Sequence, residues 1–370
     1  MSRHLSLDRL VKMACTVAFT FAPAYVHADS FTQTNLVSNV PGLANTTDPN
    51  LRNPWGVSFG PTSPFWISNQ ASGNSTLYDG AGNITPLVVT IPGGGPPSGP
   101  TGQVFNSAPG FTLSNGNSAL FIFDTLNGTI AGWNGGLGTT AQTVVPTSGA
   151  IYTGLTQNTS NGSTYLYAAD SKGSIHVFDS SWAEVTNTTF AGKFVDNTLP
   201  PGFTPFNVQS IGSDIYVTYA GQSGGFVDEF DSSGKFIKRI ASNGPLSSPW
   251  GITLAPAGFG SFSNDLLIGN FGNGEILAYN PTTDAFLGTI DGSNGHPLVN
   301  DFLWALETRT GGANVNLNAV YFTAGIDNQT DGLFGEITAA PSPVPEPATI
   351  IDAAFGLITF ALYKVRSRAR

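Results

Sequence analysis

Short apolar stretches, many with alternating polar and hydrophobic positions, follow one another between residues 31 and 339. Stretches of this length that are rich in valine, isoleucine, phenylalanine, tyrosine and threonine are typical of β-strands. Glycine, asparagine and aspartate separate them, and these residues suit tight turns because they tolerate positive φ or bond turn amides. No amphipathic helical period is evident in this region. The pattern therefore predicts an all-β protein.

One unit of this pattern occurs twice with closely similar residues. Residues 53–59 read Asn-Pro-Trp-Gly-Val-Ser-Phe, and residues 248–254 read Ser-Pro-Trp-Gly-Ile-Thr-Leu. Two further apolar stretches follow in each unit, at 65–69 and 75–79 and at 265–270 and 275–280. Self-similarity of this kind indicates a repeat architecture.

Further copies of the unit fill the rest of the region. Their second strands are expected at 120–124, 165–170, 214–219 and 319–323. Their third strands are expected at 129–134, 174–179, 226–231 and 332–337. A glycine lies in each turn between second and third strands, where hairpins require positive φ: Gly73, Gly128, Gly173, Gly224, Gly274 and Gly332. The resulting six units are roughly 45 to 55 residues long, which is typical of propeller blades.

An outer fourth strand is expected in five units, for example at 84–91 and 235–240, whereas the sixth unit ends near Ile337 without one. Residues 33–40 resemble such a strand and precede the first unit. If this stretch pairs with the last unit, the ring closes and two exposed sheet edges disappear. We therefore predict a six-bladed β-propeller of four-stranded antiparallel blades over residues 29–339, closed by the N-terminal strand.

The first 28 residues have the pattern of a secretory signal peptide. A basic start over residues 1–12 precedes a mostly apolar run at 13–25. Val-His-Ala at 26–28 predicts cleavage after Ala28. The only cysteine of the chain, Cys15, lies inside this segment. The processed chain is therefore expected to contain no disulfide.

The C-terminal residues form a different kind of segment. Residues 340–347 are a proline-rich linker that ends in Pro345, Glu346 and Pro347. Residues 348–370 contain an apolar run followed by four cations. An apolar run before a basic end is typical of a segment that is held in a membrane with its end on the cytoplasmic side.

This tail resembles the PEP-CTERM sorting signal of Gram-negative bacteria, although Asp352 interrupts its apolar run. The resemblance implies processing by an exosortase near the Pro-Glu-Pro motif, with transient anchoring in the inner membrane. The implied destination is the cell surface or the extracellular space.

The body of the chain resembles six-bladed propellers of the NHL type. More narrowly, it is similar to an uncharacterised family of bacterial secreted propellers that carry PEP-CTERM tails. The repeated Pro-Trp-Gly unit and the Asn-Leu-Val-Ser-Asn start at residues 35–39 carry this resemblance over residues 31–339. It implies a fold and no particular chemistry.

Charge excludes one class of partner. Residues 29–347 contain 7 Lys and Arg against 22 Asp and Glu, a net charge of −15. Phosphate binding needs clustered cations, and only Lys235, Lys238 and Arg239 are close together in sequence. Nucleic acid is therefore not an expected partner. A polysaccharide or an envelope protein fits an acidic exported domain better.

Hydrolytic chemistry finds little support in the residue pattern. The processed chain has two histidines, His176 and His296, and no Gly-x-Ser-x-Gly motif. No zinc-binding spacing is present. Calcium held in the central channel by carboxylates and amides remains an open alternative, because Asp and Asn are abundant.

The strongest candidate binding residues are three tryptophans at equivalent positions in units one, five and six: Trp55, Trp250 and Trp304. Their indoles could stack on sugars near the channel mouth, with nearby Arg52, Glu307 and Arg309 bonding hydroxyl groups. The alternative is that the indoles pack between blades, which is the commoner role of large aromatic residues. The sequence favours packing.

These observations predict an exported, surface-sorted propeller that acts as a binding or structural module of the cell envelope or extracellular matrix. Glycan binding is the most specific version of this prediction. The alternative function is a calcium-assisted hydrolase or lyase, similar to a lactonase, with its site in the channel. No catalytic residue is assigned, and no cofactor is expected apart from that calcium.

Overall fold

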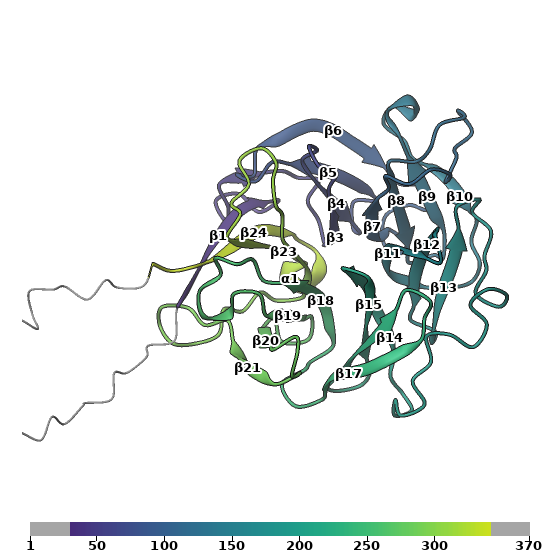
Figure 1. Ribbon diagram of the computed structural model, residues 1–370. Coiled ribbons are helices and arrows are strands. Elements are labelled where there is room, and N and C mark those ends of the chain that lie inside the picture. The colour runs from purple at the N-terminus through teal and green to yellow at the C-terminus, as the bar shows by residue number, and fades with distance from the viewer. Residues whose placement is uncertain (1–29, 342–370) are drawn as a thin grey trace, which may run out of the picture.

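A computed structural model describes residues 30–341 of the chain. The predicted signal peptide and the sorting motif with its apolar and basic end lie outside the described residues. Six twisted antiparallel sheets are arranged around a central axis (Figure 1), which confirms the predicted six-bladed propeller. Within residues 30–341, no helix combines the length and the apolar character needed to cross a bilayer.

Each blade is a meander whose first strand is innermost. Blade 1 contains β3 (Pro54–Ser58), β4 (Phe65–Asn69), β5 (Asn74–Tyr78) and β6 (Ile84–Thr90). Blade 2 contains β7 (Pro100–Phe105), β8 (Phe121–Thr125), β9 (Ile130–Trp133) and β10 (Gln142–Val145). Blade 3 contains β11 (Tyr152–Ser160), β12 (Ser163–Asp170) and β13 (Ser174–Asp179).

The remaining blades complete the ring. Blade 4 contains β14 (Thr204–Ile211), β15 (Asp214–Ala220), β16 (Phe226–Asp231) and β17 (Phe236–Ser242). Blade 5 contains β18 (Pro249–Leu254), β19 (Leu266–Asn270), β20 (Ile276–Tyr279) and β21 (Phe286–Thr289). Blade 6 contains β22 (Leu303–Glu307), β23 (Ala319–Ala324), β24 (Leu333–Ala339) and, from the start of the chain, β1 (Phe31–Ser38) with the two-residue β2 (Thr46–Thr47).

The N-terminal strand closes the ring as predicted. β1 pairs with β24 in antiparallel register, from Phe31 opposite Ala339 to Ser38 opposite Leu333. The Phe31 amide also donates to the carbonyl of Asp291 in the neighbouring blade, at 2.8 Å. The first and last strands of the described chain therefore stabilise each other.

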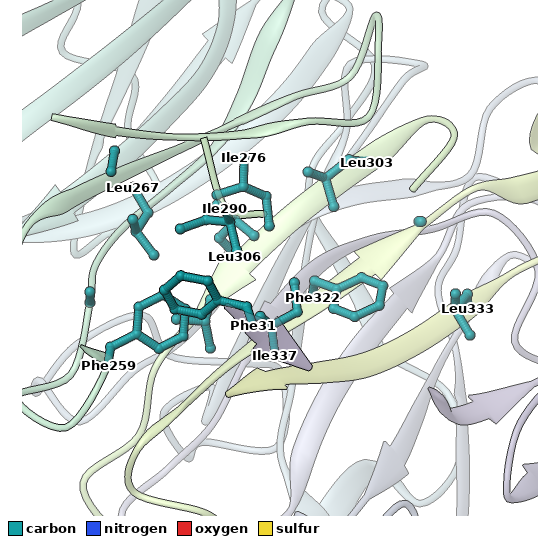
Figure 2. Close-up of a cluster of buried hydrophobic side chains, with 14 residues drawn as sticks. Phe31, Phe259, Leu267, Ile276, Ile290, Leu303, Leu306, Phe322, Leu333 and Ile337 are labelled. Carbon is teal, nitrogen blue, oxygen red and sulfur yellow. The ribbon is translucent and has the colours of Figure 1, made fainter. Parts of the chain in front are cut away.

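Buried apolar side chains fill the space between neighbouring blades. Figure 2 shows the cluster between blades 5 and 6, in which Phe31 from β1 lies beside Phe259 and Ile337. The Phe31 and Phe259 ring centroids are 4.8 Å apart. Because side chains alternate across a strand, each blade can present one apolar set to each neighbour. This explains why the sequence reads as short, strongly apolar strands.

Blade 3 departs from the prediction. The sequence led us to expect outer strands in five units, but in the described residues only β6, β10, β17 and β21 take that place in their own blades. Beside β13, the Val185 amide still donates to the Val177 carbonyl at 2.8 Å, but the Val177 amide bonds the Thr186 hydroxyl instead of a carbonyl. Phe178 and Glu184 form an isolated bridge, but the residues after Thr186 leave the sheet edge, so no fourth strand forms.

The turn glycines agree with the prediction in five blades. Gly73, for example, has φ of 68°, and Gly128, Gly173, Gly224 and Gly274 also have positive φ. Gly332 does not, so the prediction was wrong at this position. In blade 6, Asp327, Asn328 and Gln329 adopt positive φ instead, within the short α1 (Ile326–Gln329). A Cβ on Gly332 would lie 2.3 Å from the Leu51 carbonyl oxygen. Glycine is therefore needed here because the backbone of Leu51 packs directly against it.

Small residues let the inner strands approach one another around the axis. A Cβ built on Gly56 would lie 2.6 Å from the Thr101 carbonyl oxygen, and one on Gly251 would lie 2.4 Å from the Trp304 carbonyl oxygen. Real Cβ atoms do not come this close to backbone. A glycine at the third position of β3, β7, β11 and β18 therefore lets each of these inner strands pack closely against its neighbour.

Replacing Gly102 by alanine should strongly destabilise the protein. The new Cβ would lie 2.1 Å from the Leu155 nitrogen, and because this atom belongs to the backbone of blade 3 it cannot rotate away. We expect the free energy of unfolding, measured by chemical denaturation, to fall by about 3 kcal/mol. Gly311→Ala is the matched control, because no atom lies within 4 Å of its added Cβ. A loss no larger than in this control would contradict the close approach.

Candidate functional site

The three predicted tryptophans come together at one end of the channel, near the start of the inner strands. The indoles of Trp55 and Trp304 stack with centroids 3.4 Å apart, and Trp250 meets both edge-on at 6.3 and 5.7 Å. Their side chains are only 5%, 1% and 4% exposed. Phe206 and Phe271 pack on Trp304 as well. The indole faces are thus covered by other rings, and this end of the channel is closed.

The other predicted residues lie in three different environments. Arg52 is exposed near the tryptophan end and donates from Nε to the Thr330 carbonyl at 3.0 Å. Arg309 is buried, with its guanidinium 4.3 Å from the centroid of the Phe59 ring. Its Nη2 donates to the Ser63 carbonyl at 2.9 Å. Arg309 therefore packs on aromatic rings and bonds backbone through Nη2, whereas its buried Nε and Nη1 have no hydrogen-bond partner among the described residues. Glu307 lies three residues after Trp304, toward the opposite end of the channel.

That opposite end is an open cavity of about 300 Å³. Its walls include side chains from five of the inner strands, among them Ser58, Val104, Thr156, Gln209 and Glu307. Farther in, between Gly56, Gly102 and Gly251, lies a smaller cavity of about 20 Å³, which is large enough for a water molecule. The channel is thus closed by indoles at one end and lined by hydroxyl, amide and carboxyl groups at the other.

Most polar groups in this cavity are already engaged. The Gln103 amide donates to the carbonyls of Gly56 and Trp66. The Thr156 hydroxyl accepts from the Ser210 amide at 2.9 Å. Among the described residues, no hydrogen-bond partner is found for the Gln209 side chain, and the Glu307 carboxylate accepts only from the Thr308 amide at 3.0 Å. These two groups, from blades 4 and 6, and the Ser58 hydroxyl of blade 1, which also lacks a hydrogen-bond partner among the described residues, are the ones available to a ligand.

Burial raises the pKa of Glu307 to about 7, because a carboxylate loses hydration in this site. Near neutral pH the group can therefore either donate or accept a hydrogen bond. Sequence reasoning had included Glu307 but missed Gln209. Aligning the inner strands would have found Gln209. It holds the fifth position of residues 205–209, which Ser58 holds in residues 54–58 and Glu307 holds in residues 303–307.

A second buried carboxyl joins two strands of blade 2. Asp124 accepts from the Thr101 hydroxyl at 2.7 Å and from the Gly102 amide at 2.6 Å. Asp170, at the equivalent position of blade 3, accepts from the Lys172 turn amide at 3.0 Å, whereas Asp124 bonds the inner strand instead. Burial raises the pKa of Asp124 to about 7.

These raised pKa values predict that acidification stabilises the protein. Between pH 4 and pH 7 the folded protein retains protons on Asp124 and Glu307 that the unfolded chain releases, so the free energy of unfolding falls as pH rises through this window. Each of the two raised pKa values contributes roughly 2 to 3 kcal/mol of additional stability at pH 5 relative to pH 8, and urea titration at each pH measures their sum. Asp124→Asn should flatten this slope, whereas Asp301→Asn, at an exposed position, should not.

The histidines lie away from the cavity. In β13, the His176 nitrogens are 2.9 Å from the Glu184 carboxylate and 3.4 Å from the Asp170 carboxylate. His296 lies in an exposed loop before blade 6. Within residues 30–341, no group of three or more His, Cys, Asp or Glu side chains is arranged to hold a metal ion.

The fold and the channel define a six-bladed β-propeller with one polar, open end. No family model matches the sequence. The chain belongs to the same family as uncharacterized protein R648 of Acanthamoeba polyphaga mimivirus, to which it is 30% identical over 323 residues, covering 82% of this chain and 78% of the relative. Uncharacterized protein L690 of the same virus is 28% identical over 326 residues, covering 82% of this chain and 84% of the relative. The relatives found are thus viral, whereas the sequence resemblance was to bacterial proteins.

Solved structures with similar folds include a streptogramin B lyase, at 13% identity and a TM-score of 0.49, covering 84% of this chain and 98% of that one. A chain of a nidogen/laminin complex, also at 13% identity, has a TM-score of 0.44 and covers 72% of this chain and 84% of that one.

Proposed function

We propose that this protein is an exported binding module that holds a sugar residue at the open end of its channel. The cavity carries the proposal: about 300 Å³ of space in which amide and hydroxyl groups surround a single carboxyl group. Sugars present many hydroxyl groups that both donate and accept, and neutral amides and hydroxyls match them without costly burial of charge. The closed tryptophan end would support the cavity from below.

Gln209 and Glu307 are the residues expected to contact the ligand, because the Gln209 side chain has no hydrogen-bond partner among the described residues and the Glu307 carboxylate accepts only from the Thr308 amide. We expect a glycan array to identify a ligand and Gln209→Ala to weaken its binding about tenfold, measured by calorimetry, since one such polar contact contributes about 1.4 kcal/mol. Gln222→Ala, in an exposed loop outside the cavity, is the matched control. Equal losses in both variants, or binding that Gln209→Ala leaves unchanged, would contradict the site.

Export and surface sorting are part of the same proposal. The order of basic, apolar and small residues before Ala28 supports secretion, and the Pro345-Glu346-Pro347 motif followed by an apolar run and a basic end supports processing by an exosortase. A polysaccharide or an envelope protein would then be the partner. N-terminal sequencing of protein secreted by a Gram-negative host should begin at Asp29, and a retained Met1 would contradict this part.

A second candidate function is a hydrolase or lyase acting in the channel, optionally with calcium held by Glu307 and the Gln209 amide oxygen. One observation favours it: burial raises the pKa of Glu307 to about 7, which suits a general acid or base. An enzyme of this kind would show a pH–rate limb near pH 7 that disappears in Glu307→Gln. A binding module would show no turnover of the bound glycan in either protein.

A further inference from the structure

A second cavity of about 300 Å³ lies between blades 3 and 4, away from the channel. Its walls come from the β11–β12 turn, the start of β12, residues 189–193 and the β16–β17 turn. The strands that precede the two turns, β11 and β16, run in the same direction along the axis. Both turns therefore lie on the face where the channel opens. The cavity exists because blade 3 lacks a regular outer strand and residues 180–203 fold over the gap instead.

Aromatic packing fixes the shape of this cavity. Phe190 is 4% exposed and meets the Tyr165 ring at a centroid distance of 4.9 Å and the Tyr167 ring at 5.8 Å. Phe194 continues the cluster, with its ring 5.5 Å from Tyr167. Tyr167 also donates from its hydroxyl to the Ser232 carbonyl at 2.7 Å, which joins the two blades. The cavity wall is therefore part of the folded core.

The same contacts hold the backbone of Lys193 in place. Its amide donates to the Phe190 carbonyl at 3.0 Å, and the next amide, from Phe194, donates to the Gly234 carbonyl at 2.8 Å. A Cβ on Gly234 would lie only 2.7 Å from the Lys193 Cβ, so the lysine packs directly against the β16–β17 turn. The backbone of Lys193 is thus fixed at the cavity wall, and its side chain is exposed.

The lining chemistry selects for an anion that also carries hydroxyl groups. Lys193 has no carboxylate within 4 Å in the described chain, and no acidic side chain lines the cavity. Asn161 and Thr189 add an amide and a hydroxyl. Tyr165 is half-buried and adds an aromatic ring whose hydroxyl bonds no described residue.

We propose that this cavity binds a pyranose that carries a carboxylate, that is, a uronic acid residue of a polysaccharide. Its carboxylate would form a charge-assisted hydrogen bond with the Lys193 ammonium group. The sugar ring would lie along Tyr165, and its hydroxyl groups would meet Asn161 and Thr189. This site is separate from the channel, so it would exist even if the channel bound nothing.

Calorimetry with the full chain tests the proposal, with sodium glucuronate as the probe and glucose and inorganic phosphate as the other ligands. We expect glucuronate to bind about tenfold more tightly than glucose, and phosphate at equal concentration not to displace it. Lys193→Gln should weaken glucuronate binding about tenfold, and Tyr165→Ala should weaken glucuronate and glucose alike. Lys172→Gln, at an exposed lysine outside the cavity, should bind glucuronate as the unchanged protein does.

Thermal unfolding of Lys193→Gln checks that the variant is folded. We expect it to unfold at the same temperature as the unchanged protein, because the Lys193 side chain is exposed. Glucuronate binding that Lys193→Gln leaves intact would overturn the proposal, and so would displacement of glucuronate by phosphate, which would show a simple anion site. The channel site is distinguished by Gln209→Ala, which should leave glucuronate binding unchanged. Loss of glucuronate binding in Gln209→Ala but not in Lys193→Gln would place this ligand in the channel instead.

Discussion

Trp304→Ala is expected to lower the free energy of unfolding by about 4 kcal/mol, as is typical when a fully buried large aromatic side chain is removed. The Trp304 side chain is 1% exposed and stacks on Trp55. Its Nε1 donates to the Asn53 side chain at 3.0 Å. The substitution would leave a cavity where blades 1, 5 and 6 meet, and it would remove the partner of a buried amide. Urea denaturation followed by tryptophan fluorescence measures the loss.

Phe286→Ala is the control for this experiment. Its side chain is an aromatic ring on an outer strand and is 47% exposed, so its loss should cost less than about 1 kcal/mol. If Trp304→Ala melted like the unchanged protein but lost glycan binding, the indoles would be a binding site rather than packing. The observed burial predicts the reverse: reduced stability, with ligand binding at the open end retained in the folded fraction.

Deleting residues 31–38 should leave the protein largely unfolded or aggregated. The deletion removes β1, whose side chains Phe31, Leu36 and Val37 are 2%, 3% and 0% exposed. Burying three such side chains contributes roughly 5 to 8 kcal/mol, which is comparable to the whole stability of many domains. It also exposes the edge of β24, and an unpaired edge invites pairing between molecules. Circular dichroism and size-exclusion chromatography measure the outcome.

Two comparisons make the closure experiment specific. Thr32→Ala changes an exposed position of the same strand and should alter stability by less than about 0.5 kcal/mol. A synthetic peptide of residues 30–40 should restore cooperative unfolding of the deletion variant, because a strand can be added to a free sheet edge. A deletion variant that melts like the full chain would show that β1 is dispensable for closure.

The architecture was largely readable from the residues because strands and turns depend on local patterns. The third strand predicted at 174–179 is β13, and the one predicted at 226–231 is β16, with unchanged bounds. The closing strand expected at 33–40 is β1, displaced by two residues. The prediction of a regular outer strand failed in blade 3, because Phe190 and Phe194 gain more from packing on Tyr167 than from extending the sheet.

The candidate sites were less predictable, because a side chain is available to a ligand only if nothing else in the fold uses it. Arg309 looked suitable in sequence, yet it is buried over Phe59. Gln103 and Gln209 both lie on inner strands, in blades 2 and 4, but only the first is engaged by backbone carbonyls, from Gly56 and Trp66 in blade 1. These contacts join residues that are distant along the chain, so no local pattern reports them.

By itself, the sequence determined the fold class, the number of blades, the closing strand and the common position of the three tryptophans. It did so because alternation, turn residues and repetition are properties of short segments. Only the tertiary structure decided that the indoles cover one another, that the channel opens at the opposite end, and that Lys193 is held beside a cavity between blades 3 and 4. The physical reason is that burial, pKa and availability depend on which segments are neighbours in space, and packing between blades determines those neighbours.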